Sequence, residues 1–245
     1  MNILKNHKVL LFNNPKCGST SLRQYVQPYS VNLNCIPFWS PDCYHYEYYN
    51  DYQMKRLNNL RRTQAYKLKK TDNSFSTIHT HITPLDVSRI IKDSSEESLV
   101  HEFNDYDKIC FTRNPWARVY SLWKMLRSEN NDLKKSFTDF VCDLEQHLAL
   151  DFHPVIRYVI EGTKSFVSDT KGNITVDHIF KIENTVEFTD YMLEAHNIPS
   201  GNFRHLNSTT TNLPSYTSQY NSKTIKIIES RYQWEIDYFG YKFAE

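Results

Sequence analysis

The chain has 245 residues, of which 40% are hydrophobic and 23% are charged, and its formal net charge at pH 7 is +1. This length and hydrophobic content suffice for one substantial core, so we expect a single domain over residues 1–245. The near-neutral charge argues against nucleic-acid binding by the whole surface, which would normally need a marked excess of Lys and Arg. Any anion site must therefore be local.

Cysteine usage and the amino-terminal residues bear on the cellular compartment. Five cysteines are scattered along the chain with no Cys-x-x-Cys spacing, so neither a zinc site nor a redox pair is predicted. Residues 2–8 are polar, the apolar run at 9–12 is too short for a secretory signal, and no run approaches a membrane span. We therefore expect a cytoplasmic protein without a membrane span.

A strand, a tight loop and a helix are predicted near the start of the chain. Residues 9–12 are apolar and bounded like a buried strand, and residues 22–26 can form a helix. A loop between two such elements directs backbone N–H groups and the positive end of a helix dipole toward one point, which predicts an anion site. The residues offered to the anion are Lys16, Cys17, Gly18, Ser19, Thr20 and Ser21.

The loop sequence indicates which class of phosphate-containing ligand the anion site would bind. It lacks the second glycine and the Gly-Lys-Ser/Thr ending of a Walker A loop, and no strand ends in an obvious magnesium-binding aspartate. An ordinary ATPase or GTPase is therefore disfavoured. The pattern Pro-Lys-x-Gly-Ser-Thr-Ser after a strand resembles the 5′-phosphosulfate loop of the sulfotransferases, which use 3′-phosphoadenosine 5′-phosphosulfate (PAPS). The alternative is a purely structural junction with a capping serine.

Residues 28–70 differ from the rest of the chain. Residues 28–52 are rich in Tyr without a clean period, and residues 53–70 predict a helix with many basic and no acidic residues. The resemblance to the sulfotransferases is weakest here, so we expect an acceptor-side insertion in which Arg61 and Arg62 contact the substrate. The alternative is a solvated basic face.

Two histidines follow this segment. The pattern of residues 75–82 predicts a strand, in which successive side chains point to opposite faces. His79 and His81 would therefore lie on the same side. Either imidazole could take a proton from a hydroxyl as a general base. The pair resembles the paired histidines of heparan sulfate 2-O-sulfotransferase and its relatives, which implies that a histidine is the base. No third ligand is suggested by the spacing, so we predict no metal.

A second motif lies near the middle of the chain. Residues 108–112 predict another buried strand, and Pro115 begins a helix over residues 115–127 with apolar positions three and four residues apart. In the sulfotransferases an arginine at such a strand end and a serine eight residues later hold the 3′-phosphate of PAPS. The resemblance implies these roles for Arg113 and Ser121. The alternative is an arginine paired with a carboxylate and a surface hydroxyl.

The second half continues the alternation of helices and strands. Helices are predicted over residues 137–150, 185–196 and 222–238, and a strand over residues 176–183. The resemblance makes His153 a candidate acceptor contact, and the alternative is a structural role. The resemblance also makes Tyr220 and Lys223, at the end of the polar run 207–221, candidates in a loop that closes over the cofactor.

These patterns predict an α/β, three-layer fold with a mostly parallel central sheet and a P-loop-like phosphosulfate-binding loop after the first strand. The resemblance implies a metal-independent enzyme that moves a sulfuryl group from PAPS to a carbohydrate hydroxyl, with Lys16 and a histidine as catalytic groups. The alternatives are a nucleotide-dependent, kinase-like phosphotransferase and a non-catalytic polyanion-binding module on a sulfotransferase fold. A Golgi lumenal location would follow if the chain were a trimmed catalytic domain. The acceptor and the oligomeric state are left open.

Overall fold

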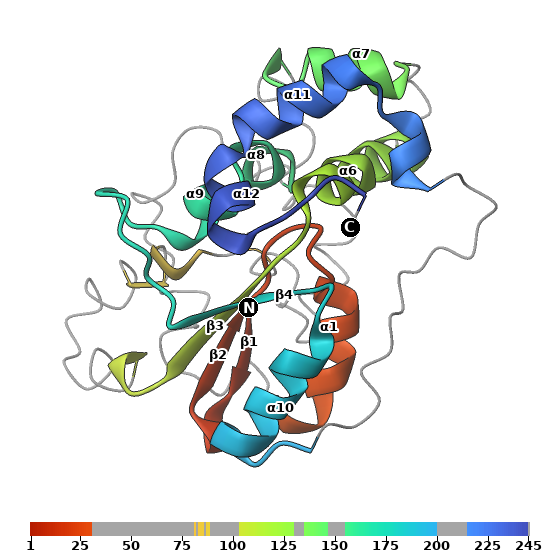
Figure 1. Ribbon diagram of the computed structural model, residues 1–245. Coiled ribbons are helices and arrows are strands. Elements are labelled where there is room, and N and C mark those ends of the chain that lie inside the picture. Colours follow the sequence, from red (N-terminus) through yellow and green to blue (C-terminus); the bar gives the residue numbers. More distant parts are fainter. Residues whose placement is uncertain are drawn as a thin grey trace, which may run out of the picture.

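The computed structural model describes residues 1–30, 81, 83–85, 87–88, 103–129, 135–146, 155–199 and 215–244. These residues contain a four-stranded sheet with the strand order β1-β2-β3-β4. The strands are β1 (Asn2–Leu4), β2 (Val9–Phe12), β3 (Asp107–Thr112) and β4 (His178–Lys181) (Figure 1). The pairs β2 with β3 and β3 with β4 are parallel, and β1 pairs antiparallel with β2. The predicted α/β fold with a mostly parallel sheet is confirmed.

The helices α1 and α10 lie beside the sheet, and most of the other labelled helices gather beyond its edge (Figure 1). The helices with described bounds are, in chain order, η1 (Lys5–His7), α1 (Ser19–Val26), η2 (Gln27–Tyr29), α6 (Pro115–Glu129), α7 (Phe137–Cys142), α8 (Val155–Glu161), α9 (Thr163–Val167), α10 (Thr185–His196), η9 (Tyr216–Gln219), α11 (Ser222–Arg231) and α12 (Gln233–Phe239).

Both faces of the sheet are buried, as the alternation along β2 demonstrates. Val9 and Leu11 pack into a cluster with residues of α1 and α10. Leu10 and Phe12 point to the opposite face and pack with residues of α9. Because side chains of a strand alternate between faces, a run of four apolar residues is what a strand covered on both sides requires.

The strand β1 was not predicted from the sequence. It has three residues, beginning with the polar Asn2, and so carries too little pattern to be recognised. The loop expected after the first strand therefore follows the second strand of the sheet. The register places Phe12 opposite Cys110 and Thr112 opposite Lys181, so the parallel strands end together at one edge.

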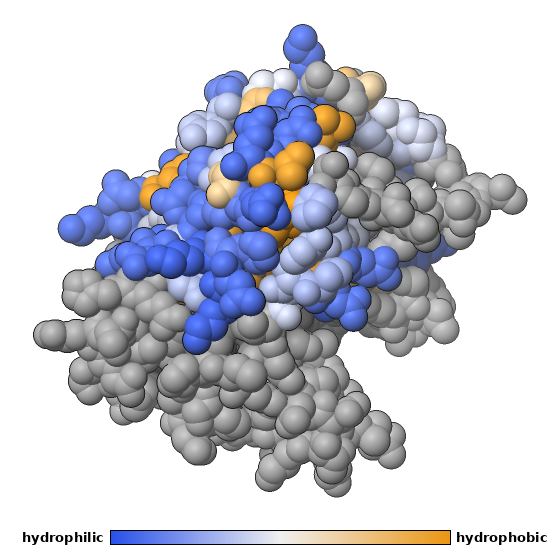
Figure 2. Space-filling model, turned by 90° about the horizontal axis from the view of Figure 1, so that it is seen from below, coloured by the Kyte–Doolittle hydropathy of each residue, from blue (hydrophilic) through white to orange (hydrophobic). Residues whose placement is uncertain are grey.

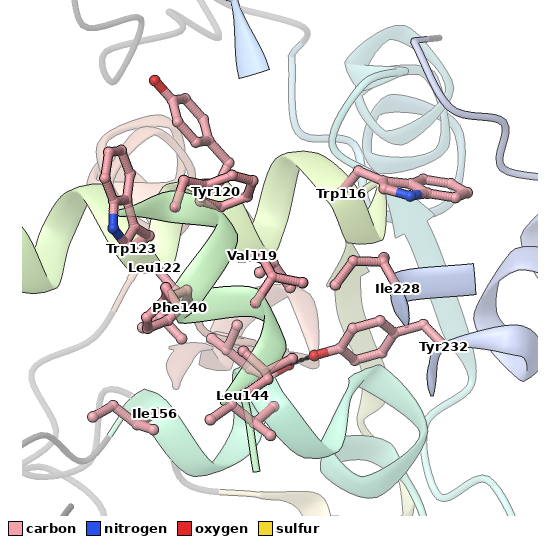
Figure 3. Close-up of a cluster of buried hydrophobic side chains, with 14 of the residues drawn as sticks. Trp116, Val119, Tyr120, Leu122, Trp123, Phe140, Leu144, Ile156, Ile228 and Tyr232 are labelled. Atoms are coloured by element: carbon pink, nitrogen blue, oxygen red, sulfur yellow. Dashed lines mark hydrogen bonds between the residues drawn. The ribbon is translucent and has the colours of Figure 1, made fainter. Parts of the chain in front are cut away.

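A second core lies beyond this carboxyl edge, among α6, α7, α8, α11 and α12 (Figures 1 and 3). The helix α6 contributes side chains at three- and four-residue spacing, which include Trp116, Val119 and Trp123. Ile228 and Tyr232 pack against them from the C-terminal part of the chain. This core fixes the start of α6 above the sheet edge.

Two helix predictions were too long. The helix predicted over residues 137–150 ends at Cys142 with a turn after it, and residues 147–150 lie outside the described part. The helix predicted over residues 222–238 is divided into α11 and α12 at Tyr232, whose φ of −109° and ψ of 27° interrupt the helical backbone. The predicted elements between residues 31 and 80 also lie outside the described residues.

Hydrophilic side chains dominate the described surface on the face drawn in Figure 2, where hydrophobic residues form only small areas. Among the described residues, the large hydrophobic side chains that are exposed are Val186, Leu193 and Tyr238. None of the helices in the described ranges combines the length and apolarity that crossing a bilayer requires.

Candidate functional site

The loop between β2 and α1 makes a tight turn at the carboxyl edge of the sheet. Its backbone is left-handed at Lys16 (φ 63°) and Gly18 (φ 77°), and the Cys17 N–H donates to the Asn14 carbonyl (3.3 Å). Gly18 is the N-cap residue of α1, and no side chain caps that helix. The backbone N–H groups at the start of α1 therefore follow directly after Lys16 in the same turn, a combination that favours an anion.

Exposure within the loop separates contact residues from supporting ones. Lys16, Gly18, Ser19 and Thr20 are half-buried, so they can reach a ligand. Cys17 is buried, and burial raises the pKa of its thiol to about 12. It is therefore a neutral thiol at pH 7 and supports the loop instead of acting as a nucleophile.

Arg113 brings the second sequence motif to this loop. Its Nη1 donates to the Lys16 carbonyl oxygen (3.1 Å), so residues 97 positions apart in the chain are in direct contact. Asn114 holds the adjacent helix start, because its Oδ1 accepts from the Trp116 N–H (3.2 Å) and the Asn114 N–H donates to Glu183 (2.8 Å). Ser121 follows on α6, where it is half-buried.

His81 approaches the same loop from the side of β2. Its Nδ1 lies 2.6 Å from the Asn13 carbonyl oxygen. Because a carbonyl can only accept, this contact assigns the ring hydrogen to Nδ1 and leaves the lone pair of the neutral imidazole on Nε2. His81 lies in a turn, while His79 and the rest of the predicted strand fall outside the described residues.

The remaining predicted contacts have different surroundings. The Tyr220 hydroxyl donates to the Trp116 carbonyl (2.8 Å), its ring packs against Phe137, and burial raises the pKa of the phenol. Lys223 is exposed in the first turn of α11. Their contact with a cofactor stays a prediction, and Arg61, Arg62 and His153 lie outside the described residues.

Sequence reasoning missed a buried polar group behind the loop. The guanidinium of Arg118 pairs with the Glu235 carboxylate through Nη1 to Oε2 (2.5 Å) and Nη2 to Oε1 (2.8 Å), and both side chains are buried. Burial alone would lower the pKa of Arg118, but the charge of Glu235 and the hydrogen bonds to it raise that pKa, so the guanidinium stays protonated. The partners are 117 positions apart, so no local spacing could have indicated them.

Asn14 connects this buried pair to the loop. Its Nδ2 donates to the Phe111 carbonyl (3.0 Å) and to Thr163 Oγ1 (3.1 Å), and Thr163 Oγ1 also accepts from Arg118 (2.7 Å). The sequence placed Asn14 in the loop but gave no sign that it faces inward. Within the part of the chain that is described, no three His, Cys, Asp or Glu side chains are grouped to hold a metal ion.

Comparisons with known proteins complete the description of the site. A scan against protein-family models found no match, and a search among curated proteins found none either. Among solved structures, the chain is similar to one described as the crystal structure of a sulfotransferase from Alicyclobacillus acidocaldarius. The two are 13% identical, the alignment covers 91% of this chain and 94% of that chain, and the TM-score is 0.42. The function is therefore inferred from the residues of the site.

Proposed function

We propose that this chain is a sulfotransferase that moves a sulfuryl group from PAPS to a hydroxyl of a carbohydrate acceptor. The observation that carries the proposal is the hydrogen bond from Arg113 to the Lys16 carbonyl (3.1 Å). It supports a single nucleotide site, because it joins the loop expected for the 5′-phosphosulfate to the arginine expected for the 3′-phosphate.

The donors present at the loop suit a nucleotide with two phosphate groups. Residues 13–21 contain no acidic side chain, α1 begins without a side-chain cap, and Lys16 and Arg113 bring two cations to one edge of the sheet. Residues 16–21 would hold the 5′ side, and Arg113 with Ser121 would hold the 3′-phosphate, to which a guanidinium can bind through two hydrogen bonds. Tyr220 and Lys223 remain candidates for closing the site.

PAPS, when bound, supplies the sulfuryl group. Sulfuryl transfer resembles phosphoryl transfer, in which the protein mainly positions the reactants and neutralises developing charge. Lys16 Nζ would donate to the oxygen that leaves with the nucleotide. His81 Nε2 would accept the proton of the attacking hydroxyl, because Asn13 holds the ring hydrogen on Nδ1. His79 is the alternative base.

The acceptor side of the proposal rests on residues that the structure does not describe. We assign Arg61, Arg62 and His153 to contacts with the carbohydrate, within a single domain that has an acceptor-side insertion at residues 28–70. Basic side chains at the acceptor side would favour an acidic polysaccharide.

A transfer assay tests this function. The purified chain would be incubated with radiolabelled PAPS and a panel of polysaccharides, in the presence of a metal chelator. We expect label in a polysaccharide and release of adenosine 3′,5′-bisphosphate, with both lost in His81→Ala. Phosphate transfer from ATP that requires magnesium, with no transfer from PAPS, would instead identify a kinase-like enzyme. Nucleotide binding without any turnover would identify a binding module.

A further inference from the structure

We propose that Thr163 is a positioning residue for the phosphate-binding loop, acting through Asn14 and anchored by the Arg118–Glu235 ion pair. This inference rests on the proposed function, because it assigns the loop to the nucleotide. Thr163 begins α9 and is fully buried, so it cannot touch the nucleotide itself.

The hydroxyl of Thr163 has a polar neighbour for each of its hydrogen-bonding positions. Oγ1 lies 2.7 Å from Arg118 Nη1, 3.1 Å from Asn14 Nδ2 and 3.2 Å from Thr112 Oγ1. The first two neighbours can only donate, so they use the two lone pairs of the hydroxyl. Its hydrogen must therefore go to Thr112, which fixes the direction of every bond at this centre.

The ion pair holds Thr163 in place from its other side. Oε1 of Glu235 accepts from the Thr163 N–H (2.8 Å), while both Glu235 oxygens accept from Arg118. Gly162 allows this close approach, because a Cβ on its left-handed backbone (φ 92°) would collide with Oε1. A buried carboxylate that accepts several hydrogen bonds has little freedom to move, so it provides a rigid anchor.

Asn14 links Thr163 to the loop, because it contacts both. The Phe111 carbonyl can only accept, which fixes Nδ2 toward β3 and Thr163. The Asn14 carbonyl in turn accepts from the Cys17 N–H (3.3 Å), at the turn that contains Lys16 and Gly18. Arg118 also lies on α6 between Arg113 and Ser121, so one network supports both sides of the nucleotide site.

The substitution Thr163→Val removes the hydroxyl while keeping the shape of the side chain. We expect faster amide hydrogen exchange at Cys17 and Leu22 with unchanged exchange in β2 and β3, and about tenfold weaker binding of adenosine 3′,5′-bisphosphate by calorimetry. Thr163→Ser restores the hydroxyl and should restore both properties. The matched control is Thr189→Val, which removes another buried threonine hydroxyl on α10 and should change neither.

Unchanged exchange at Cys17 in folded Thr163→Val protein, or a Thr163→Ser variant that behaves like Thr163→Val, would overturn the inference. If Thr163→Val does not fold, Asn14→Ala leaves the Arg118–Glu235–Thr163 contacts intact and should produce the same loop-specific exchange. Failure of the wild-type chain to bind the nucleotide would contradict the proposed function alone. The exchange measurements need no nucleotide, so they would still decide whether Thr163 positions the loop.

Discussion

Lys16 and Arg113 are joined by one hydrogen bond, yet their substitutions should impair different steps. Lys16→Ala removes the ammonium proposed to stabilise the leaving oxygen, so turnover should fall by about 100-fold with little change in nucleotide affinity. Arg113→Ala removes the cation proposed for the 3′-phosphate, so affinity for adenosine 3′,5′-bisphosphate should fall by about tenfold or more. Single-turnover rates at saturating PAPS and calorimetric dissociation constants separate the two effects.

A conservative variant and a second nucleotide serve as controls for these measurements. Arg113→Lys keeps the charge but loses the planar pair of donors, so its affinity should lie between those of the wild type and Arg113→Ala. Affinity for 5′-AMP, which lacks the 3′-phosphate, should change much less in Arg113→Ala. Full turnover by Lys16→Ala with PAPS bound would disprove the role assigned to Lys16.

At the scale of elements, the junction between β2 and α1 depends on Gly18. Its φ of 77° is left-handed, and a Cβ there would lie 2.6 Å from the Cδ1 of Ile182, which follows β4. Gly18→Ala should therefore lower the free energy of unfolding by about 2–3 kcal/mol, because backbone strain and a steric clash add. Chemical denaturation measures this loss.

Gly240 provides a matched control for the clash. It is also left-handed (φ 64°), but a Cβ there would meet no atom within 4 Å. Gly240→Ala should cost only the backbone strain, about 1 kcal/mol. Equal losses in the two variants would mean that the contact with Ile182 does not constrain the junction.

Elements with strong local patterns could be predicted from the sequence. The strand β2 and the helices α6 and α10 follow from apolar runs and from helical spacing, which depend only on neighbouring residues. The break at Tyr232 could not be predicted, because tyrosine fits a helix and the interruption accompanies the burial of Glu235 against Arg118. Contacts over such separations leave no periodic signal.

At the scale of the whole molecule, Asp107 connects α10 to the sheet at the edge opposite the loop. Its Oδ2 accepts from the Tyr191 hydroxyl (2.6 Å) and from His196 Nε2 (2.8 Å). Burial raises the pKa of Asp107, but the hydrogen bonds from His196 and Tyr191 outweigh it, so the net pKa is lowered. The ionised carboxylate therefore stabilises the folded state.

The lowered pKa fixes the sign of a pH effect. The stabilisation should be fully present above the pKa of Asp in the unfolded chain, about 3.9, and should be lost as pH falls through the lower pKa of the folded state. The free energy of unfolding should thus fall more steeply in the wild type than in Asp107→Asn when pH is lowered from about 5 to about 2. Urea denaturation across this range measures both slopes, and identical slopes would contradict the prediction.

The sequence could predict which motifs lie near each other at the candidate site, but not the buried residues that hold those motifs in place. The proximity of Lys16 and Arg113 could be predicted, because each lies in a short motif between a strand and a helix and parallel strands end at a common edge. Their contact with a ligand stays a prediction. The inward orientation of Asn14 and the roles of Thr163 and Glu235 could not be predicted, because they arise where three distant segments meet. Motifs indicate what touches a ligand, whereas the groups that hold a motif in place depend on the assembled core.

A selective site for a 3′-phosphorylated nucleotide is tested most directly by calorimetric titration of the wild-type chain. The ligands would be adenosine 3′,5′-bisphosphate, 5′-AMP and ATP, each with and without magnesium. We expect adenosine 3′,5′-bisphosphate to bind at least about tenfold more tightly than 5′-AMP, independently of magnesium, because only it engages Arg113 and Ser121. Equal affinity for the two adenosine phosphates, or a preference for ATP with magnesium, would contradict a PAPS site.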